Sequence, residues 1–179
     1  PTELVDKIEA SSKFNQGYDF GEVLEAALLD MKWHALSKDE AAAIDTAAEV
    51  SEYEDKSLRE LGLEVDLVPP RYRTTYFNHI FSGPAGYSAG YYSYLWTQML
   101  DHDSRNWFLQ NGGLTRANGD HYRDTVIGRG GTMDYGEMYR NFAGRDPNVG
   151  YMLYALGLAP ALPEDGPRIA GEVSDGKLP

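Results

Sequence analysis

The sequence predicts a mainly α-helical fold, and three observations support that prediction. One long stretch carries apolar residues at helical spacing, namely Val23, Leu24, Ala27, Leu28, Met31 and Ala35. Clusters of glycine, proline and asparagine, which interrupt helices, divide the chain into segments of helical length. No run shows the alternation of apolar and polar residues that is typical of strands. We therefore expect several helices and no sheet.

Three helices are expected in the first third of the chain. The first begins with Thr2 as a possible N-cap, and residues 11–17 form a break after it. Asp19 is expected to cap the second helix. The third starts at Asp39 and runs to about Arg59, with scattered charges that indicate a solvated face.

The middle of the chain is expected to hold a connector, a short helix and a long helix. The connector, residues 61–70, ends in two prolines, which cannot continue a helix. Residues 71–81 are expected to form the short helix. The long helix, rich in aromatic residues, is expected from Tyr87 to about Phe108, where Asn111 and two glycines would stop it.

The remaining sequence predicts three more helices and a tail. The next helix starts at Thr115 and ends before Gly128, and two short ones follow at 134–142 and 148–156. Residues 159–179 are rich in proline, glycine and charge, which predicts an extended or disordered tail. We therefore expect one helical segment over residues 1–158.

Composition excludes several functions. The 179 residues carry a net charge of −12 and a pI near 4.6, which argues against binding nucleic acid or an anionic membrane surface. Without cysteine there is neither a disulfide nor a thiolate metal site. No apolar run is long enough to span a membrane. We expect a cytoplasmic location, with a periplasmic one left open, and Pro1 indicates an excised initiator or a cut within a longer precursor.

No metal site is predicted from the residues themselves. The histidines are His34, His79, His102 and His121, and none stands three or four positions from another. Asp30 precedes His34 by four positions, a pairing that usually means only a surface interaction. A zinc site needs three or four converging ligands, so we expect no metal ligand set within this chain.

Two short motifs are weak candidates for other chemistry. The string G-Y-S-A-G around Ser88 fits the G-x-S-x-G pattern of a nucleophilic serine, but no buried strand precedes it, as that motif requires. The G-P-A-G loop from Gly83 to Gly86 lacks the Lys-Ser/Thr ending of a phosphate-binding loop. We expect neither function.

Three tyrosines give the most informative pattern. Tyr87, Tyr91 and Tyr94 stand at i, i+4 and i+7 and would share one face of a helix. Spacing alone favours a half-buried helix with its phenols at the border of the core, since buried hydroxyls need partners. The alternative is a wall that offers hydroxyl donors to a peptide carbonyl, approached by the glycine loop.

The segment from His79 to Trp96, H-I-F-S-G-P-A-G-Y-S-A-G-Y-Y-S-Y-L-W, resembles the substrate-binding segment of the M3 family of zinc metallopeptidases. That family includes peptidyl-dipeptidases, oligopeptidase A and thimet oligopeptidase. The resemblance runs from about Phe14 to Leu158. Its other motifs, in the same order, are F-N-Q-G (14–17), L-D-M-K-W-H (29–34), V-P-P-R-Y-R (68–73), N-G-G-L-T-R-x-N-G (111–119) and G-R-D-P (144–147).

The resemblance implies a site that this chain holds only in part. M3 enzymes bind zinc through an H-E-x-x-H helix and a later glutamate, and this sequence has no such helix. The resemblance thus implies a multi-helical C-terminal portion of the catalytic domain, with zinc bound by an N-terminal segment that is absent here. The implied catalytic residues are Tyr94, Tyr87 and His79, and the implied substrate-binding residues are Tyr91, Gly83 and Gly86.

One departure affects this transfer of roles. The family commonly has H-x-x-G-G-G-Y where this chain has the longer run S-G-P-A-G before Tyr87. A longer loop shifts Tyr87 relative to His79, so the resemblance implies a catalytic role more directly for Tyr94 than for Tyr87 or His79. Arg71 and Arg73, just before the segment, are expected to form structural salt bridges.

The function expected from the resemblance is that of a substrate-binding and transition-state-stabilising segment. The sequence from His79 to Trp96 most resembles that of the zinc-dependent peptidyl-dipeptidases, which hydrolyse short peptides. An M3 oligoendopeptidase is one alternative, and a non-catalytic module that binds peptides or a partner is another. The expected partners are a peptide substrate and the N-terminal segment with H-E-x-x-H, without which we expect the chain to be inactive.

Overall fold

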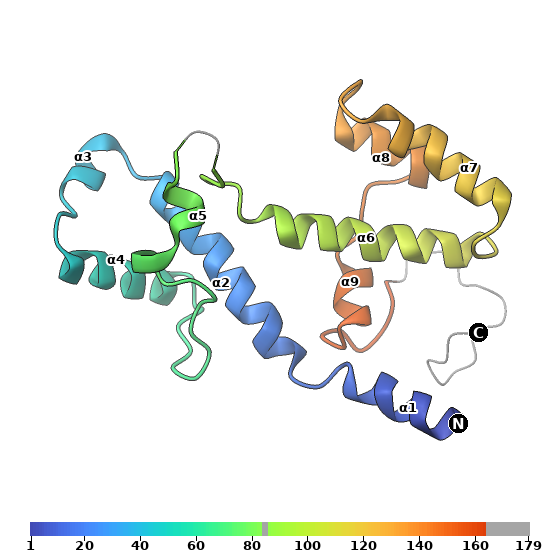
Figure 1. Ribbon diagram of the computed structural model, residues 1–179, viewed down its shortest axis with the longest axis horizontal. Coiled ribbons are helices and arrows are strands. Elements are labelled where there is room, and N and C mark those ends of the chain that lie inside the picture. Colours follow the sequence, from blue (N-terminus) through green and yellow to red (C-terminus); the bar gives the residue numbers. More distant parts are fainter. Residues whose placement is uncertain (84–85, 164–179) are drawn as a thin grey trace. The chain divides into compact units, whose positions relative to one another are not determined.

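The structure, a computed structural model, describes residues 1–83 and 86–163, and within these ranges it contains helices and turns but no strand (Figure 1). The predicted mainly α-helical fold is therefore confirmed. The α-helices are α1 (Thr2–Ser11), α2 (Gln16–His34), α3 (Lys38–Ala42), α4 (Ala47–Glu60), α5 (Asn78–Phe81), α6 (Ser93–Gln110), α7 (Arg116–Thr125), α8 (Tyr135–Ala143) and α9 (Gly150–Ala155). Two 3-10 helices are η1 (Thr74–Tyr76) and η2 (Ile127–Arg129).

The chain forms two compact units. The first comprises Pro1–Trp96 and the second begins at Thr97, so the boundary falls within α6. Most of the predicted tail, residues 164–179, lies outside the described residues. Each unit has its own buried side chains.

The region from Lys38 to Glu60 forms two helices, and the prediction of one helix from Asp39 was wrong. Both helices begin with a reciprocal capping pair, in which a hydroxyl and a glutamate three positions later each bond the other's backbone N–H. Ser37 and Glu40 form this pair for α3, and Thr46 and Glu49 form it for α4. The second pair starts a new helix, which is why one continuous helix does not form.

The predicted caps of α1 and α2 were also wrong. The N-cap of α1 is Pro1, so Thr2 is already helical. The N-cap of α2 is Asn15, which has a φ of 57° and turns the chain into the helix at Gln16. Asp19 therefore lies inside the first turn of α2, where a carboxylate is stabilised by the positive end of the helix dipole.

The core of the first unit lies between α2 and the segment around α5. Phe77, Ile80 and Tyr91 are buried in one cluster with Ala26 and Ala27 of α2. These small side chains let the aromatic rings approach the α2 backbone closely.

Helix α4 packs against α2 and η1 in the same unit. The rings of Trp33 and Tyr53 lie 4.4 Å apart between α2 and α4. The Trp33 indole N–H donates to the Thr74 hydroxyl at 2.9 Å, and the Tyr53 hydroxyl donates to the Lys32 carbonyl at 2.9 Å. These polar contacts connect α4 and η1 to the same stretch of α2.

The second unit is built around Phe142 of α8, which is 2% exposed. Trp107 of α6 contacts it at a ring separation of 4.6 Å and also stacks on His121 of α7 at 5.2 Å. A partly buried ion pair connects the residue after Gly144 to α6: the Arg145 guanidinium donates to both oxygens of the buried Asp103 at 2.8 and 2.5 Å. This paired geometry is the strong form of the arginine–carboxylate contact.

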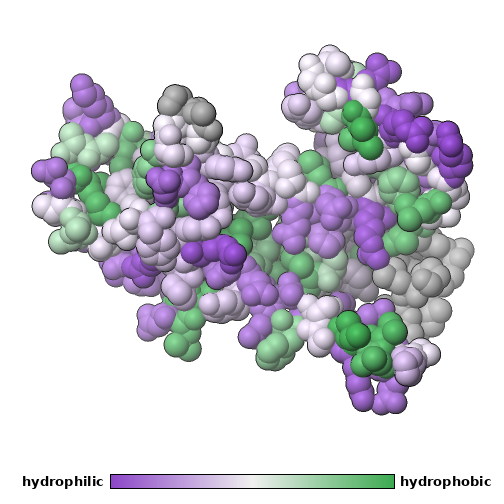
Figure 2. Space-filling model, in the orientation of Figure 1, coloured by the Kyte–Doolittle hydropathy of each residue, from purple (hydrophilic) through white to green (hydrophobic). Residues whose placement is uncertain are grey.

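The surface mixes polar and apolar side chains, and apolar ones gather over α1 (Figure 2). Leu4, Val5 and Ile8 on this helix are each more than half exposed, and α1 has no buried residue. Among the described residues, none of the helices has the length and apolar character needed to cross a membrane.

Candidate functional site

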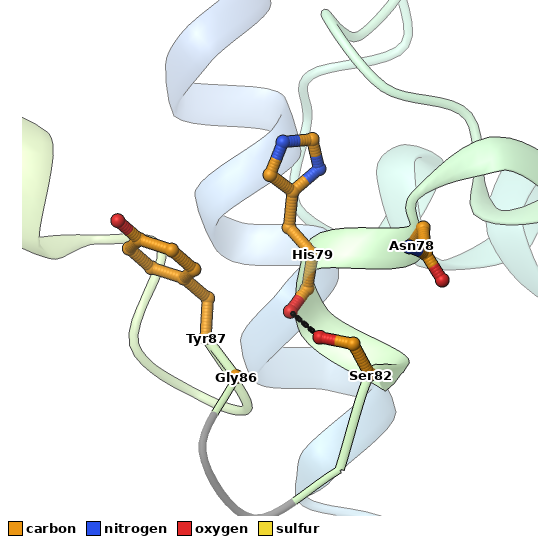
Figure 3. Close-up of a pocket in the computed structure, with 5 residues that line it drawn as sticks. All are labelled: Asn78, His79, Ser82, Gly86 and Tyr87. Carbon is orange, nitrogen blue, oxygen red and sulfur yellow. Dashed lines mark hydrogen bonds between the residues drawn. The ribbon is translucent and has the colours of Figure 1, made fainter.

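Gly86 and Tyr87 lie beside α5 (Figure 3). The Tyr87 N–H donates to the His79 carbonyl at 2.9 Å, which places the two residues side by side. Gly83 has a φ of 97°, a conformation that glycine adopts freely. A Cβ on Gly86 would lie 2.7 Å from the Ser82 hydroxyl and 2.8 Å from the His79 carbonyl oxygen. Glycine at position 86 is therefore needed for this close approach.

A turn follows the loop, and the predicted helix start at Tyr87 was wrong, because α6 begins only at Ser93. Ala89 adopts the left-handed conformation, with a φ of 53°, and this interrupts any helix through it. The Gly90 N–H donates to the Tyr87 carbonyl at 2.7 Å and closes the turn.

The turn nevertheless brings the three predicted tyrosines together. Tyr87, Tyr91 and Tyr94 form one ring cluster, which we call the tyrosine face. Tyr87 and Tyr94 are stacked with centroids 5.9 Å apart, and Tyr91 lies 6.2 Å from the first ring and 5.1 Å from the second. The Tyr94 hydroxyl donates to the Tyr87 hydroxyl at 3.3 Å.

The tyrosine face has a buried ring and two exposed ones. Tyr91 is 6% exposed, whereas Tyr87 and Tyr94 are 42% and 48% exposed. Burial, with the nearby Tyr72, raises the pKa of Tyr91, and the hydrogen bond with Tyr87 raises the pKa of Tyr94. Both phenols therefore stay protonated near neutral pH and can act as neutral hydrogen-bond donors.

His79 adjoins the tyrosine face. Its ring centroid lies 6.4 Å from Tyr87 and 6.2 Å from Tyr91. The buried Nδ1 atom has no hydrogen-bond partner among the described residues. A pocket of about 280 Å³ opens here, lined by Asn78, His79, Ser82, Gly86 and Tyr87 (Figure 3). Of the six residues predicted for the site, His79, Gly86 and Tyr87 line this pocket. Tyr91 and Tyr94 belong to the adjoining tyrosine face, and Gly83 follows Ser82 in the chain.

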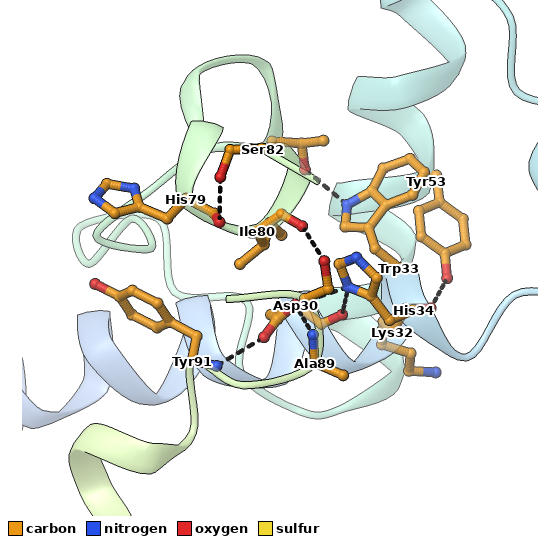
Figure 4. Close-up of polar contacts among 12 residues, drawn as sticks. Asp30, Lys32, Trp33, His34, Tyr53, His79, Ile80, Ser82, Ala89 and Tyr91 are labelled. Carbon is orange, nitrogen blue, oxygen red and sulfur yellow. Dashed lines mark hydrogen bonds and ion pairs between the residues drawn. The ribbon is translucent and has the colours of Figure 1, made fainter. Parts of the chain in front are cut away.

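Asp30 is a site residue that the sequence reasoning missed. We interpreted it as half of a surface pair with His34, but its side chain is 0% exposed. It accepts the N–H groups of Ala89 and Tyr91, each at 2.9 Å, and the His34 Nδ1 lies 2.8 Å from its Oδ1 (Figure 4). An aspartate within the apolar run A-A-L-L-D-M was the signal available in the sequence.

Tyr72 is a second residue that was missed. Its ring stacks on Phe77 at 5.0 Å and contacts His79 at 4.7 Å and Tyr91 at 5.9 Å. Tyr72 thus supports His79 and Tyr91 from the side of the core.

The other motif predictions are resolved by the contacts. Arg71 pairs with Glu22 at 2.5 Å, and Arg73 pairs with Glu54 and Asp55, so both arginines form the salt bridges that were predicted. The Ser88 hydroxyl donates to the Ile80 carbonyl at 2.9 Å. Ser88 is therefore part of the turn's hydrogen bonding.

The described residues do not fit a zinc ion. Within residues 1–83 and 86–163, histidine, aspartate and glutamate nowhere gather in a group of three or more that could hold a metal. Asp30 and His34 are only a pair, and the backbone amides occupy the carboxylate.

Comparison with known proteins agrees with the motifs. The family model "Peptidase family M3" matches residues 1–158. The dipeptidyl carboxypeptidase of Salmonella typhimurium is 46% identical over 158 residues, and that of Escherichia coli is 45% identical. Oligopeptidase A of Escherichia coli is 31% identical over 163 residues. The chain therefore belongs to peptidase family M3, and the resemblance stated above is confirmed.

The alignments cover most of this chain but only a small part of each relative. Each of the three alignments covers 88% of this chain but only 22% of the relative. The chain thus spans about a fifth of the length of these proteins.

Proposed function

We propose that this chain forms the substrate-binding and transition-state-stabilising wall of an M3 peptidase that removes dipeptides from the carboxyl end of short peptides. The observation that carries the proposal is the tyrosine face: the Tyr87 and Tyr94 hydroxyls lie 3.3 Å apart beside the His79 pocket. The choice of reaction is supported by the names of the two relatives at 46% and 45% identity.

Each residue of the site has a defined part in this proposal. Tyr94 donates its hydroxyl to the oxygen of the cleaved carbonyl as negative charge develops there, an effect that typically lowers the barrier by about 3 kcal/mol. Tyr87 and His79 hold the peptide near the cleaved bond, and Tyr91 supports both exposed phenols. Gly83 and Gly86 lie along the loop that the extended peptide would approach.

Zinc in this proposal belongs to another segment, because the described residues do not fit it. We propose that an N-terminal segment with H-E-x-x-H is the partner of this chain and binds the metal. The steps assigned to this chain are hydrogen bonding and positioning only.

A chimera tests the catalytic part of the proposal. In it, this chain replaces the matching 22% of Escherichia coli dipeptidyl carboxypeptidase. Tyr94→Phe removes one hydroxyl, and we expect kcat to fall by roughly a hundredfold or more with little change in KM. The matched control is Tyr92→Phe, since Tyr92 is 47% exposed and does not share the ring contacts of the tyrosine face among the described residues.

We expect the control to retain kcat within about twofold, as for a surface change. A Tyr94→Phe chimera with the kcat of the parent chimera would exclude the oxyanion role. A parent chimera that folds, binds zinc and cleaves no peptide would exclude the proposed function itself.

The second candidate is an M3 oligoendopeptidase, which the 31% identity to oligopeptidase A supports. The two reactions differ in whether the peptide's carboxyl end must be free. We expect the chimera to release C-terminal dipeptides from a free peptide and to leave the same peptide with an amidated end uncut. Internal cleavage of the amidated peptide would favour the oligoendopeptidase.

A non-catalytic peptide-binding module is the third candidate, and the lack of a metal-binding group among the described residues favours it for the chain alone. The module and the proposed function both predict no cleavage when zinc and a short peptide are added to this chain alone. Peptide cleavage that a chelator abolishes would contradict the module.

A further inference from the structure

The Asp30 carboxylate lies on α2, 59 residues before the first backbone group that it binds, Ala89. Both oxygens are used. Oδ1 accepts the Ala89 N–H and Oδ2 accepts the Tyr91 N–H, each at 2.9 Å (Figure 4). The side chain is 0% exposed, so water does not compete for these bonds.

His34 completes the set of donors around this carboxylate. Its Nδ1 lies 2.8 Å from Oδ1 and 2.9 Å from the Asp30 backbone oxygen. Both of these atoms are acceptors, so Nδ1 carries the hydrogen. Asp30 is thus a buried acceptor that faces three N–H groups, and no neutral amide side chain can satisfy all three.

These bonds fix the backbone from which the tyrosine face projects. Ala89 has a φ of 53°, which residues with a side chain rarely adopt, and the bond from Asp30 lies at this residue. Tyr91, whose N–H donates the other bond, contacts the rings of both Tyr87 and Tyr94. Without the carboxylate, the turn loses the two hydrogen bonds that stabilise this conformation. The backbone that positions the three rings is then less fixed.

We propose that Asp30 is a positioning residue: it holds the turn at Ala89 and Tyr91 in the conformation that brings the tyrosine face together. Its role in catalysis rests on the proposed function, but its effect on the turn does not. Asp30 acts through backbone amides and does not touch the substrate.

The alternative is that Asp30 only stabilises the first unit. Glu54 provides the matched comparison, because it is a second buried carboxylate in this unit. It is 2% exposed, accepts the Thr74 N–H at 2.7 Å and pairs with Arg73, and neither it nor Thr74 belongs to the tyrosine face. Asp30→Asn and Glu54→Gln each replace one oxygen of a buried carboxylate by an N–H₂ group and remove its negative charge.

The first experiment measures assigned NMR spectra and amide hydrogen exchange of the 179-residue chain and both variants, without peptide. For Asp30→Asn we expect the Ala89 and Tyr91 amides to exchange roughly ten- to a hundredfold faster. The ring signals of Tyr87 and Tyr94 are expected to shift. For Glu54→Gln we expect the Thr74 amide to change and these ring signals to stay as in the parent. Unchanged ring signals in Asp30→Asn, or equal changes in both variants, overturn the proposal.

If Asp30→Asn does not fold, amide exchange in the parent chain tests the proposal. The Ala89 and Tyr91 amides are then expected to exchange at least about a hundredfold slower than in an unfolded chain. Rapid exchange of both overturns the proposal.

The same two substitutions in the chimera separate this inference from the proposed function. We expect Asp30→Asn to lower kcat at least about tenfold, and Glu54→Gln to leave it within about twofold at a temperature where both are folded. If the ring signals shift while neither Asp30→Asn nor Tyr94→Phe changes kcat, the positioning role stands and the proposed function fails.

Discussion

At the scale of single residues, Glu25 on α2 is a buried carboxyl group with an altered pKa. It is 2% exposed, and its Oε2 has no hydrogen-bond partner among the described residues. Burial, with the neighbouring Glu22, raises the pKa of Glu25 to about 7. The folded chain therefore favours the protonated acid. In the unfolded chain, glutamate has an ordinary pKa near 4.5. The contribution of Glu25 to the free energy of unfolding is therefore fully present below pH 4.5 and is lost as the pH rises toward 7.

This difference predicts a pH-dependent effect of Glu25→Gln. At pH 8 the charged carboxylate is costly to bury, so the variant is expected to be more stable than the parent by roughly 1 to 3 kcal/mol. At pH 4 the two should be similar. Urea unfolding at both pH values measures this difference, and Glu52→Gln, at an exposed position of α4, is the control. An equal difference at both pH values would contradict the raised pKa.

At the scale of elements, the reciprocal capping pair of Thr46 and Glu49 determines where α4 begins. The Thr46 hydroxyl accepts the Glu49 N–H, and the Glu49 carboxylate accepts the Thr46 N–H. Thr46→Ala removes the first bond, and we expect a loss of about 1 kcal/mol in unfolding free energy.

The control for this substitution lies on the same helix. The Ser51 hydroxyl only donates to the Ala47 carbonyl at 3.1 Å within α4. Such a bond does not stabilise a helix, so Ser51→Ala should be neutral or slightly stabilising. Urea unfolding compares the two variants, and an equal loss in both would show that the cap at Thr46 contributes nothing specific.

The same elements show what could be predicted from the sequence. The S-K-D-E and T-A-A-E strings at Ser37 and Thr46 carry both capping pairs, so the division into α3 and α4 was readable from local pattern. The α7 and α8 starts were predicted correctly because Thr115 and Asp134 cap them through local bonds. Local contacts are available to sequence reasoning because the partners lie within one turn.

The candidate site was only partly predictable. The spacing of Tyr87, Tyr91 and Tyr94 identified residues that do gather, but through a turn and not a helical face. The turn depends on Asp30, which lies 59 residues from Ala89. No local pattern contains such a bond. The roles of these residues in catalysis stay a prediction.

At the scale of the whole molecule, the metal content of the isolated chain is the property to measure. The described residues contain no group of three or more ligands, and stable zinc sites use three or four. We expect the purified chain, loaded with zinc and dialysed, to hold far less than one zinc per chain by mass spectrometry of the native protein. Tight binding of one zinc would show that the chain has a metal site of its own.

The two units also differ in their tryptophans, which has a practical consequence. Trp33 lies in the first unit beside Tyr53, and Trp107 lies in the second against Phe142. The third indole, Trp96, is 52% exposed. In a chain with Trp96→Phe, the two remaining fluorophores report on different halves of the molecule. Removing either one in turn lets emission reveal whether the halves melt together or in sequence.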